Sequence, residues 1–116
     1  MSMIFCPLYS GSSGNALYVK YGDTSLLIDC GKPGKKLTEA MQSIGVDPAS
    51  LTGILITHEH SDHISGAGVM SRKYHLPIYA TAGTWQGMDG KIGAIAPENR
   101  VVFDKRSDFY LGGIGV

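Results

Sequence analysis

Three of the four histidines in this chain crowd into one short segment together with an aspartate. The segment reads GILITHEHSDHISG, and directly after an apolar run it places His58, His60, Asp62 and His63. Imidazole nitrogens and carboxylate oxygens are ligands that suit zinc, and also iron or manganese. The segment therefore predicts a metal site at the end of a buried strand.

His58 and His60 are expected to hold one metal ion between them. Alternate side chains of an extended strand share a face, so both imidazoles can point the same way while Glu59 points the opposite way. Glu59 is then expected to face polar surroundings or to bind a residue that supports the ligands.

Asp62 and His63 are expected to hold a second ion. If Ser61 caps the next helix, both residues lie in its first turn, where the helix dipole favours a carboxylate and the chain reverses direction. Residues in that turn cannot easily bind the ion that His58 and His60 hold, so the spacing predicts two metal ions. Two ions about 3.5 to 4 Å apart support hydrolysis, and Asp62 is also placed to orient or deprotonate the attacking water.

The remaining histidine and the two cysteines are expected to be structural. His75 falls in the last turn of a predicted helix, where a cation meets the helix dipole favourably at the surface. Cys6 and Cys30 are too few for a disulfide framework, so small buried apolar side chains are the expectation for both.

Length and composition indicate one globular domain over residues 1–116. The chain is 43% hydrophobic and 17% charged, which is typical of a folded protein with a core. Ten basic and ten acidic side chains cancel, so the net charge neither supports nor excludes a nucleic-acid partner. No apolar run approaches roughly 18 residues and no secretory signal is recognisable, so the sequence predicts a soluble cytoplasmic protein with no membrane partner.

The elements that must position the histidines follow from hydrophobic periodicity and turn residues. Strands are predicted at residues 3–9, 16–21, 24–29, 53–57, 78–81, 101–103 and 109–111. Helices are predicted at residues 34–44, from 61 to 74 or 75, and weakly at 84–90. This order predicts a mixed α/β structure in which helices cover a sheet.

The segment THEHSDH is similar to the HxHxDH signature of the metallo-β-lactamase superfamily, and residues 62–66 also fit its DHxxG extension. The SGSSGN turn, the LLIDCG segment and the helix before the histidines resemble the YycJ/WalJ-like group, whose members resemble nucleases. This resemblance covers residue 3 to about residue 111. It implies an αββα sandwich, a dinuclear metal centre and phosphodiester substrates.

Carried over by position, the resemblance implies ligand roles for the same four residues. His58 and His60 would hold the first ion, and Asp62 and His63 the second, with Asp62 also orienting the nucleophile. Two zinc ions are implied, with manganese or iron as alternatives. Asp29 of LLIDCG matches an acidic position that supports the metal loop without binding the ions.

The family pattern also includes a third histidine, a bridging aspartate and a last histidine further along the chain as metal ligands. In this sequence no histidine follows His75. Asp104 and Asp108 lack the expected histidine context and are expected to be surface charges. Two ions need about six protein ligands, and the motif offers four. We therefore expect the N-terminal half of a metallo-β-lactamase-fold domain, which associates with itself or is complemented by a C-terminal half.

Three functions agree with these features. The first is a metal-dependent phosphodiesterase, a DNA or RNA nuclease, and the second is hydrolysis of a thioester, lactam or lactone on the same fold. The third is a non-catalytic fragment that acts through metal binding or assembly. Lys32, Lys35 and Lys36 could meet phosphates, although a solvated helix face is the more common role of such lysines.

Overall fold

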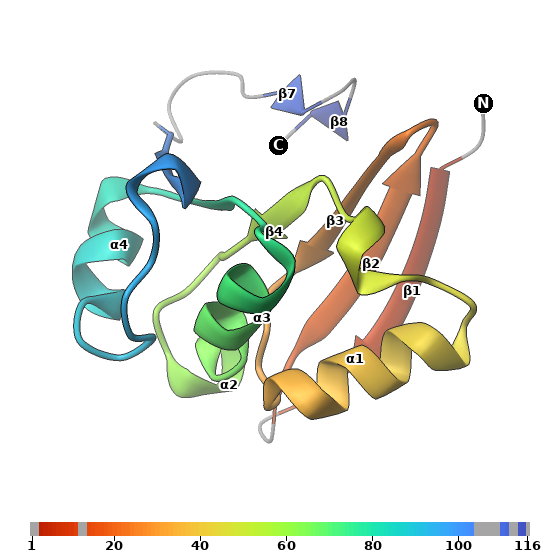
Figure 1. Ribbon diagram of the computed structural model, residues 1–116, viewed down its shortest axis with the longest axis horizontal. Helices are drawn as coiled ribbons and strands as arrows, with labels where there is room; N and C mark the ends of the chain where they lie inside the picture. The colour runs from red at the N-terminus through yellow and green to blue at the C-terminus, as the bar shows by residue number, and fades with distance from the viewer. Residues whose placement is uncertain (1–2, 12–13, 104–109, 112–113, 116) are drawn as a thin grey trace.

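A six-stranded sheet organises the chain in the strand order β1-β2-β3-β4-β5-β6 (Figure 1). The structure, a computed structural model, describes residues 3–11, 14–103, 110–111 and 114–115, and only the backbone of Asp62 and of the last two pairs. The strands are β1 (Met3–Tyr9), β2 (Ala16–Tyr21), β3 (Thr24–Ile28), β4 (Gly53–Leu55), β5 (Ile78–Ala80) and β6 (Arg100–Val102). β1, β2 and β3 pair antiparallel, whereas β3 to β6 pair parallel. A separate two-stranded sheet joins β7 (Tyr110–Leu111) to β8 (Ile114–Gly115).

Helices fill the connections between the parallel strands. They are α1 (Gly34–Ser43), η1 (Pro48–Ser50), α2 (Ser61–Ile64), α3 (Ala67–Tyr74), α4 (Ala82–Met88) and η2 (Pro97–Asn99). α1 leads from β3 to β4, α2 and α3 lead from β4 to β5, and α4 leads from β5 to β6. Such crossovers are right-handed in nearly all proteins, which collects the helices on one face of the sheet. Within the described ranges, no helix is long and apolar enough to cross a membrane.

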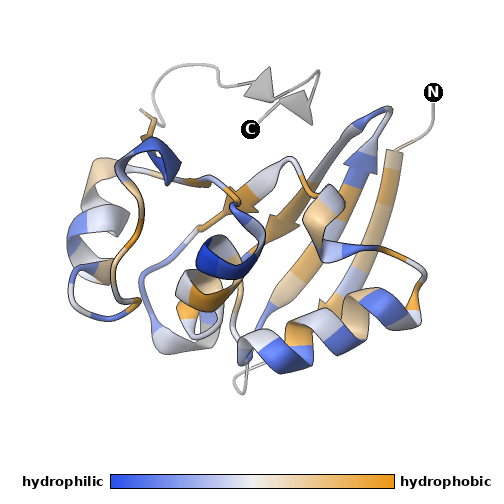
Figure 2. Cartoon of the chain, in the orientation of Figure 1, coloured by the Kyte–Doolittle hydropathy of each residue, from blue (hydrophilic) through white to orange (hydrophobic). Residues whose placement is uncertain are grey.

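The main core lies between the sheet and these helices. Leu27, Ile54 and Ile78 of the central strands are fully buried there, together with Leu37 of α1 and Met70 of α3. Figure 2 shows hydrophobic residues along the central strands and an alternation of hydrophobic and hydrophilic residues along α1. The predicted mixed α/β architecture is confirmed, and the apolar periodicity of residues 34–44 marks the helix face that packs on the sheet.

The opposite face of the sheet carries a smaller apolar cluster. Val19 and Leu26 form its centre, and Leu17, Tyr21 and Ile28 pack against them. Toward the edge of the sheet, Phe5 pairs with Val19 and remains 62% exposed. An apolar face of this kind agrees with the predicted self-association or complementation, which stays a prediction.

Most predicted elements are present within a residue or two of their expected ends. The long helix expected from residue 61 is instead two helices, α2 and α3, and the strand expected over residues 53–57 ends at Leu55. Part of the strand predicted at 109–111 is present as β7. Asp104 and Asp108 lie outside the described residues.

Gly66 explains why the predicted helix is interrupted. Its backbone N–H leaves the helical pattern and donates to the carbonyl oxygen of Cys30, at 2.8 Å. A Cβ at this position would collide with the carbonyl oxygen of Lys32 and would lie 2.6 Å from a methyl carbon of Leu37. The junction of α2 and α3 is therefore packed against the loop that follows β3, and only glycine fits there.

Replacing Gly66 by alanine is expected to lower the free energy of unfolding by on the order of 3 kcal/mol, because the methyl group meets backbone that cannot yield. Gly83→Ala in α4 is the matched control, since a Cβ there meets nothing within 4 Å. Alanine at that helical site is expected to be neutral or to stabilise by about 0.5–1 kcal/mol. Urea unfolding measures both values, and equal effects of the two substitutions would contradict the close packing at Gly66.

Candidate metal centre

The histidine motif occupies the loop after β4 and the first turn of α2. Ile56 still donates its N–H to the Tyr79 carbonyl, at 3.0 Å, but residues 57–60 have no regular secondary structure. The prediction that strand alternation aligns His58 with His60 was therefore wrong, because the strand ends before the first histidine. The predicted cap was also wrong, since His60 takes the N-cap position and Ser61 is the first helical residue.

Three imidazole rings gather around this loop. The ring centroids of His58 and His63 are 4.9 Å apart with an angle of 83° between the planes. His58 and His60 are farther apart, with centroids at 6.3 Å. His58 therefore lies nearer to His63 than to its predicted partner. The backbone of Asp62 lies in the first turn of α2, as predicted, and its side chain is outside the described structure.

The three rings are not arranged around a common point where one ion could bind. Among the side chains that the structure describes, no three from histidine, cysteine, aspartate and glutamate meet closely enough to hold an ion. The nitrogen donors of the loop are nevertheless of the type that zinc, iron and manganese take. The predicted assignment of ligands in pairs is thus compatible with the geometry and stays a prediction.

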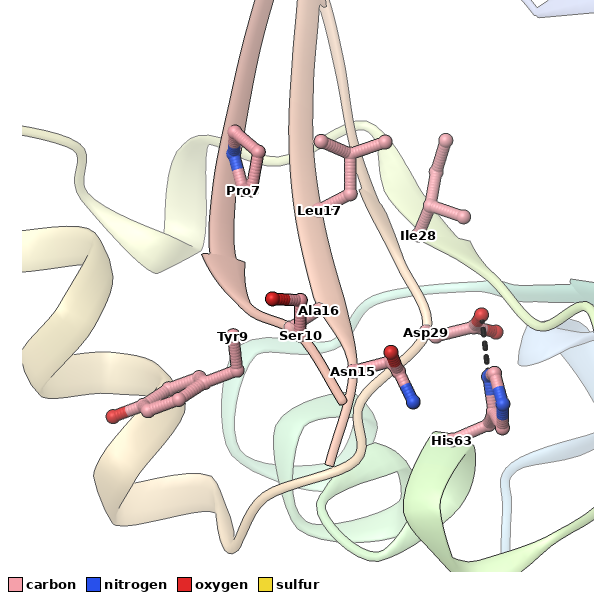
Figure 3. A pocket seen from close by; sticks show the side chains of 9 residues that line it. All are labelled: Pro7, Tyr9, Ser10, Asn15, Ala16, Leu17, Ile28, Asp29 and His63. Atoms are coloured by element: carbon pink, nitrogen blue, oxygen red, sulfur yellow. Dashed lines mark hydrogen bonds and ion pairs between the residues drawn. The ribbon is translucent and has the colours of Figure 1, made fainter. Parts of the chain in front are cut away.

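Asp29 connects the histidine loop to the end of β3. Its buried carboxylate accepts hydrogen bonds from the backbone N–H of Thr57 at 2.8 Å and from the Thr57 hydroxyl at 2.6 Å. The same carboxylate lies 2.7 Å from Nδ1 of His63 (Figure 3). Because a carboxylate only accepts, Nδ1 carries the proton and Nε2 carries the lone pair that binds metal. Asp29 thus fixes both the loop and the tautomer of His63.

The backbone around Asp29 is held by three neighbouring segments. Asp29 donates its N–H to Leu55 of β4 at 2.8 Å, and Cys30 donates to the carbonyl of His63 at 2.6 Å. Gly31 donates to the carbonyl of Asn15, at 2.8 Å, at the start of β2. Asp29 itself adopts a φ of 64°, a left-handed conformation that aspartate tolerates better than most residues. Such conformations concentrate at functional sites.

Glu59 connects the histidine loop to α4. Its half-buried side chain packs on Gly87 of α4, where a Cβ would collide with Cγ of Glu59. The sequence predicted that Glu59 would face polar surroundings or bind a residue that supports the ligands, which stays a prediction, and it did not predict the contacts of Thr57 and Gly87. Thr57 stands at the end of an apolar strand, and Gly87 is one of several glycines in a weak helix, so neither carries a recognisable signal.

A pocket of about 300 Å³ lies beside Asp29 and His63. Strands β1, β2 and β3 contribute most of its wall (Figure 3). The lining residues are Pro7, Tyr9, Ser10, Asn15, Ala16, Leu17, Ile28, Asp29 and His63. One part of this lining is apolar, and the polar groups gather toward Asp29 and His63, a combination typical of small-molecule sites.

The predicted burial is confirmed for Cys30, whereas Cys6 is only partly buried. Cys30 is fully buried in the main core, and burial, followed by the nearby charge of Asp29, raises the pKa of its thiol well above the usual range. Cys30 therefore stays a neutral thiol, unsuited to act as nucleophile or ligand. Cys6 packs against the same core, and His75 is exposed at the C-terminal end of α3.

The chain is similar to proteins of one known family. Residues 9–114 match the family model of the metallo-beta-lactamase superfamily. The exodeoxyribonuclease YycJ of Bacillus anthracis is 44% identical over 103 residues, which are 89% of this chain and 39% of that protein. The exodeoxyribonuclease WalJ of Streptococcus pneumoniae is 41% identical over 111 residues, which are 94% of this chain and 41% of that protein.

Solved structures show the same fold. A B3 metallo-beta-lactamase with an active-site glutamic acid superposes with a TM-score of 0.71 at 21% identity, over 88% of this chain and 44% of that one. The chain spans about two fifths of the length of the curated relatives that it matches. The strand order, the histidine loop and these likenesses agree with the expected fold and with the resemblance to the YycJ and WalJ proteins. The chain belongs to the metallo-beta-lactamase superfamily.

Proposed function

We propose that this chain contributes the metal-binding motif of a metal-dependent phosphodiesterase that acts on DNA as an exonuclease. The observation that carries the proposal is the hydrogen bond between Asp29 and Nδ1 of His63. It presents the Nε2 lone pair of a histidine in the HxHxDH segment, which is how supporting carboxylates orient metal ligands. The relatives at 44% and 41% identity are named exodeoxyribonucleases, which favours DNA over RNA and over small-molecule substrates.

The proposed ligands are the four residues of the motif. His58 and His60 serve one ion, and Asp62 and His63 serve the other, with two zinc ions as the first choice and manganese or iron as alternatives. Bound divalent ions would supply Lewis-acid stabilisation of the attacking and leaving oxygens of a phosphodiester. Asp62 orients the attacking water and accepts its proton, the role of a general base.

Residues around the ligands hold the motif in place before substrate arrives. Asp29 fixes the ring of His63 and the backbone of Thr57, while Glu59 packs on Gly87 of α4. Ligands supported in this way need little reorganisation on binding metal. A cytoplasmic location, where DNA substrates are present, stays a prediction, as does association through the apolar sheet face.

Cleavage of labelled DNA with and without metal tests the proposal. The intact protein, stripped with a chelator, is expected to be inactive and to regain activity on labelled single- and double-stranded DNA when zinc or manganese is added back. RNA and a chromogenic β-lactam serve as alternative substrates. Metal-dependent turnover of the lactam without turnover of DNA would support the same-fold alternative and reject the nuclease. Absence of any metal-dependent turnover would favour a non-catalytic role.

A further inference from the structure

The first residues of β1 expose apolar side chains on both faces of the sheet. Met3, Ile4 and Phe5 are 40%, 50% and 62% exposed, and they are three of the six large hydrophobic side chains exposed in the described ranges. Phe5 lies opposite Val19, on the face of the smaller apolar cluster. Ile4 lies on the helix-covered face, like Cys6, which packs against the main core. A molecule that covered only the open face would therefore leave Ile4 in water.

β1 is also an edge of the sheet. Among the described strands it pairs with β2 alone, and Figure 1 shows it as the outermost strand. α1 lies against its C-terminal end, where the Tyr9 hydroxyl donates to the carbonyl of Lys36 at 3.4 Å. The exposed apolar residues lie at the opposite end. An edge strand presents unpaired backbone N–H and C=O groups, which can pair with a strand of another chain.

The other edge of the sheet is protected in a way that β1 is not. β6 has three residues and begins with the exposed Arg100, whose guanidinium lies 4.4 Å from the centre of the Trp85 ring. Short strands and charged side chains are common means by which proteins prevent edge-to-edge pairing. β1 has seven residues, MIFCPLY, and none of them is charged. No like charges would therefore repel a second copy of this strand.

Pro7 indicates which backbone groups of β1 point away from the sheet. In an antiparallel ladder, alternate residues direct their N–H and C=O groups to opposite edges. Proline has no N–H, so within an edge strand it takes a position whose N–H would face outward. Met3 and Phe5 share this direction with Pro7, since the register is regular from Met3 to Pro7. Their backbone groups point to the free edge, and those of Ile4 point to β2.

We propose that β1 pairs with β1 of a second copy of this chain, antiparallel and about a two-fold axis beside Ile4. In this register Met3 of each copy lies opposite Phe5 of the other, and the two Ile4 residues face each other. Met3 and Phe5 exchange hydrogen bonds through their outward backbone groups. Each exposed apolar side chain gains an apolar neighbour on its own face of the sheet. The proposal goes beyond the proposed nuclease function and does not depend on it.

The composition of β1 favours this register over its neighbours. An axis at Phe5 would place Met3 opposite Pro7, which cannot donate a hydrogen bond. A shift by one residue would place open-face side chains opposite helix-face side chains. The two-fold arrangement uses the same surface of both copies, so it closes at a dimer and joins the two sheets edge to edge.

The contact is small, so the dimer should be weak and reversible. Part of one strand buries less area than standard stable interfaces do. Sedimentation velocity of the intact protein from about 10 μM to 1 mM is expected to show a monomer that converts to a dimer as concentration rises. A protein that stays monomeric over this whole range would overturn the proposal and would indicate another occupant of the edge.

Substitution of Ile4 separates edge pairing from association through the open face. Ile4→Lys places two ammonium groups opposite each other at the axis and is expected to weaken dimerisation at least about tenfold. Ile44→Lys is the matched control, because Ile44 is 41% exposed at the end of α1. It is expected to change the dimerisation constant less than about twofold. Thermal unfolding shows that each variant is folded. A dimer that tolerates Ile4→Lys as well as Ile44→Lys would contradict edge pairing.

The backbone hydrogen bonds are tested at Phe5. Phe5→Ala removes the side chain and keeps the outward N–H, whereas Phe5→Pro removes both. The pairing of β1 with β2 loses no hydrogen bond in either variant. The folded Phe5→Pro protein is expected to dimerise at least about fivefold more weakly than the Phe5→Ala protein. Equal dimerisation of the two variants would reject backbone pairing at this edge.

A cysteine at Ile4 tests the position of the axis. Opposite residues that are not hydrogen-bonded have Cα atoms about 4.5 Å apart, which a disulfide can span. Ile4→Cys is expected to form a disulfide-linked dimer under mild oxidation. Met3→Cys should cross-link at least about tenfold more slowly, because Met3 lies opposite Phe5. The unsubstituted protein reports any contribution of the partly buried Cys6. Equal cross-linking of the two variants would overturn the proposed register.

Discussion

Asp29→Asn is expected to weaken metal binding about 10- to 100-fold, the usual effect of removing a carboxylate that orients a ligating histidine. The free energy of unfolding should fall by on the order of 3 kcal/mol, since the buried carboxylate accepts three hydrogen bonds from Thr57 and His63. Asparagine has a similar size but presents an NH₂ group, which cannot accept. At least one of the donors around it therefore loses its partner.

Titration calorimetry with zinc and urea unfolding of the metal-free protein measure the two effects. Asp47→Asn is the matched control, because Asp47 is exposed and its side chain caps η1 by accepting from the N–H of Ala49. Asparagine is an equally good capping residue, so this variant should change neither quantity appreciably. An Asp29→Asn protein that binds zinc as tightly as the Asp47→Asn protein would refute the role assigned to Asp29.

His63→Ala is expected to reduce metal affinity by more than about 100-fold, the upper end of the range for residues that only support ligands. Metal-dependent cleavage of DNA should fall with it. The substitution removes a proposed ligand and also leaves the buried carboxylate of Asp29 with one donor fewer. A second consequence is therefore a loss of stability even in the absence of metal.

His75→Ala provides the comparison for this result. His75 is exposed at the end of α3 and lies away from the motif in the sequence, so its removal should leave metal content and cleavage unchanged. Metal analysis of the purified proteins gives the stoichiometry, and oligonucleotide assays give the rate. If the His63→Ala protein retained the full metal content of the His75→Ala protein, His63 would not be a ligand.

Local patterns were sufficient to predict most of the sheet and the main helix. β1 and β2 were predicted with the bounds that the structure has, because glycine-rich turns separate short runs of residues that favour strands. α1 was predicted one residue too long, since its apolar positions repeat with helical periodicity. These elements depend on neighbours in sequence, which a single sequence displays directly.

The conformation of the histidine loop could not be predicted in the same way. Thr57 leaves the strand because its N–H and hydroxyl both bond to Asp29, which lies 28 positions earlier in the chain. The break at Gly66 likewise depends on the distant backbone of Lys32 and Cys30. Residue types alone predict a metal-binding motif, whereas tertiary contacts determine where its rings lie. Asp29 was anticipated only through the family resemblance.

The long-range hydrogen bonds of Asp29 have a consequence for the order in which the chain folds. The partners of its side chain lie 28 and 34 positions away in sequence. Loop closure over such distances precedes any stabilisation by these contacts, so the segment around Asp29 should order late, after β3, α1 and β4 have docked. An incoming cation would then encounter a finished scaffold, and hydrogen exchange at Thr57 should occur through local opening, at a lower free energy than exchange in the central strands.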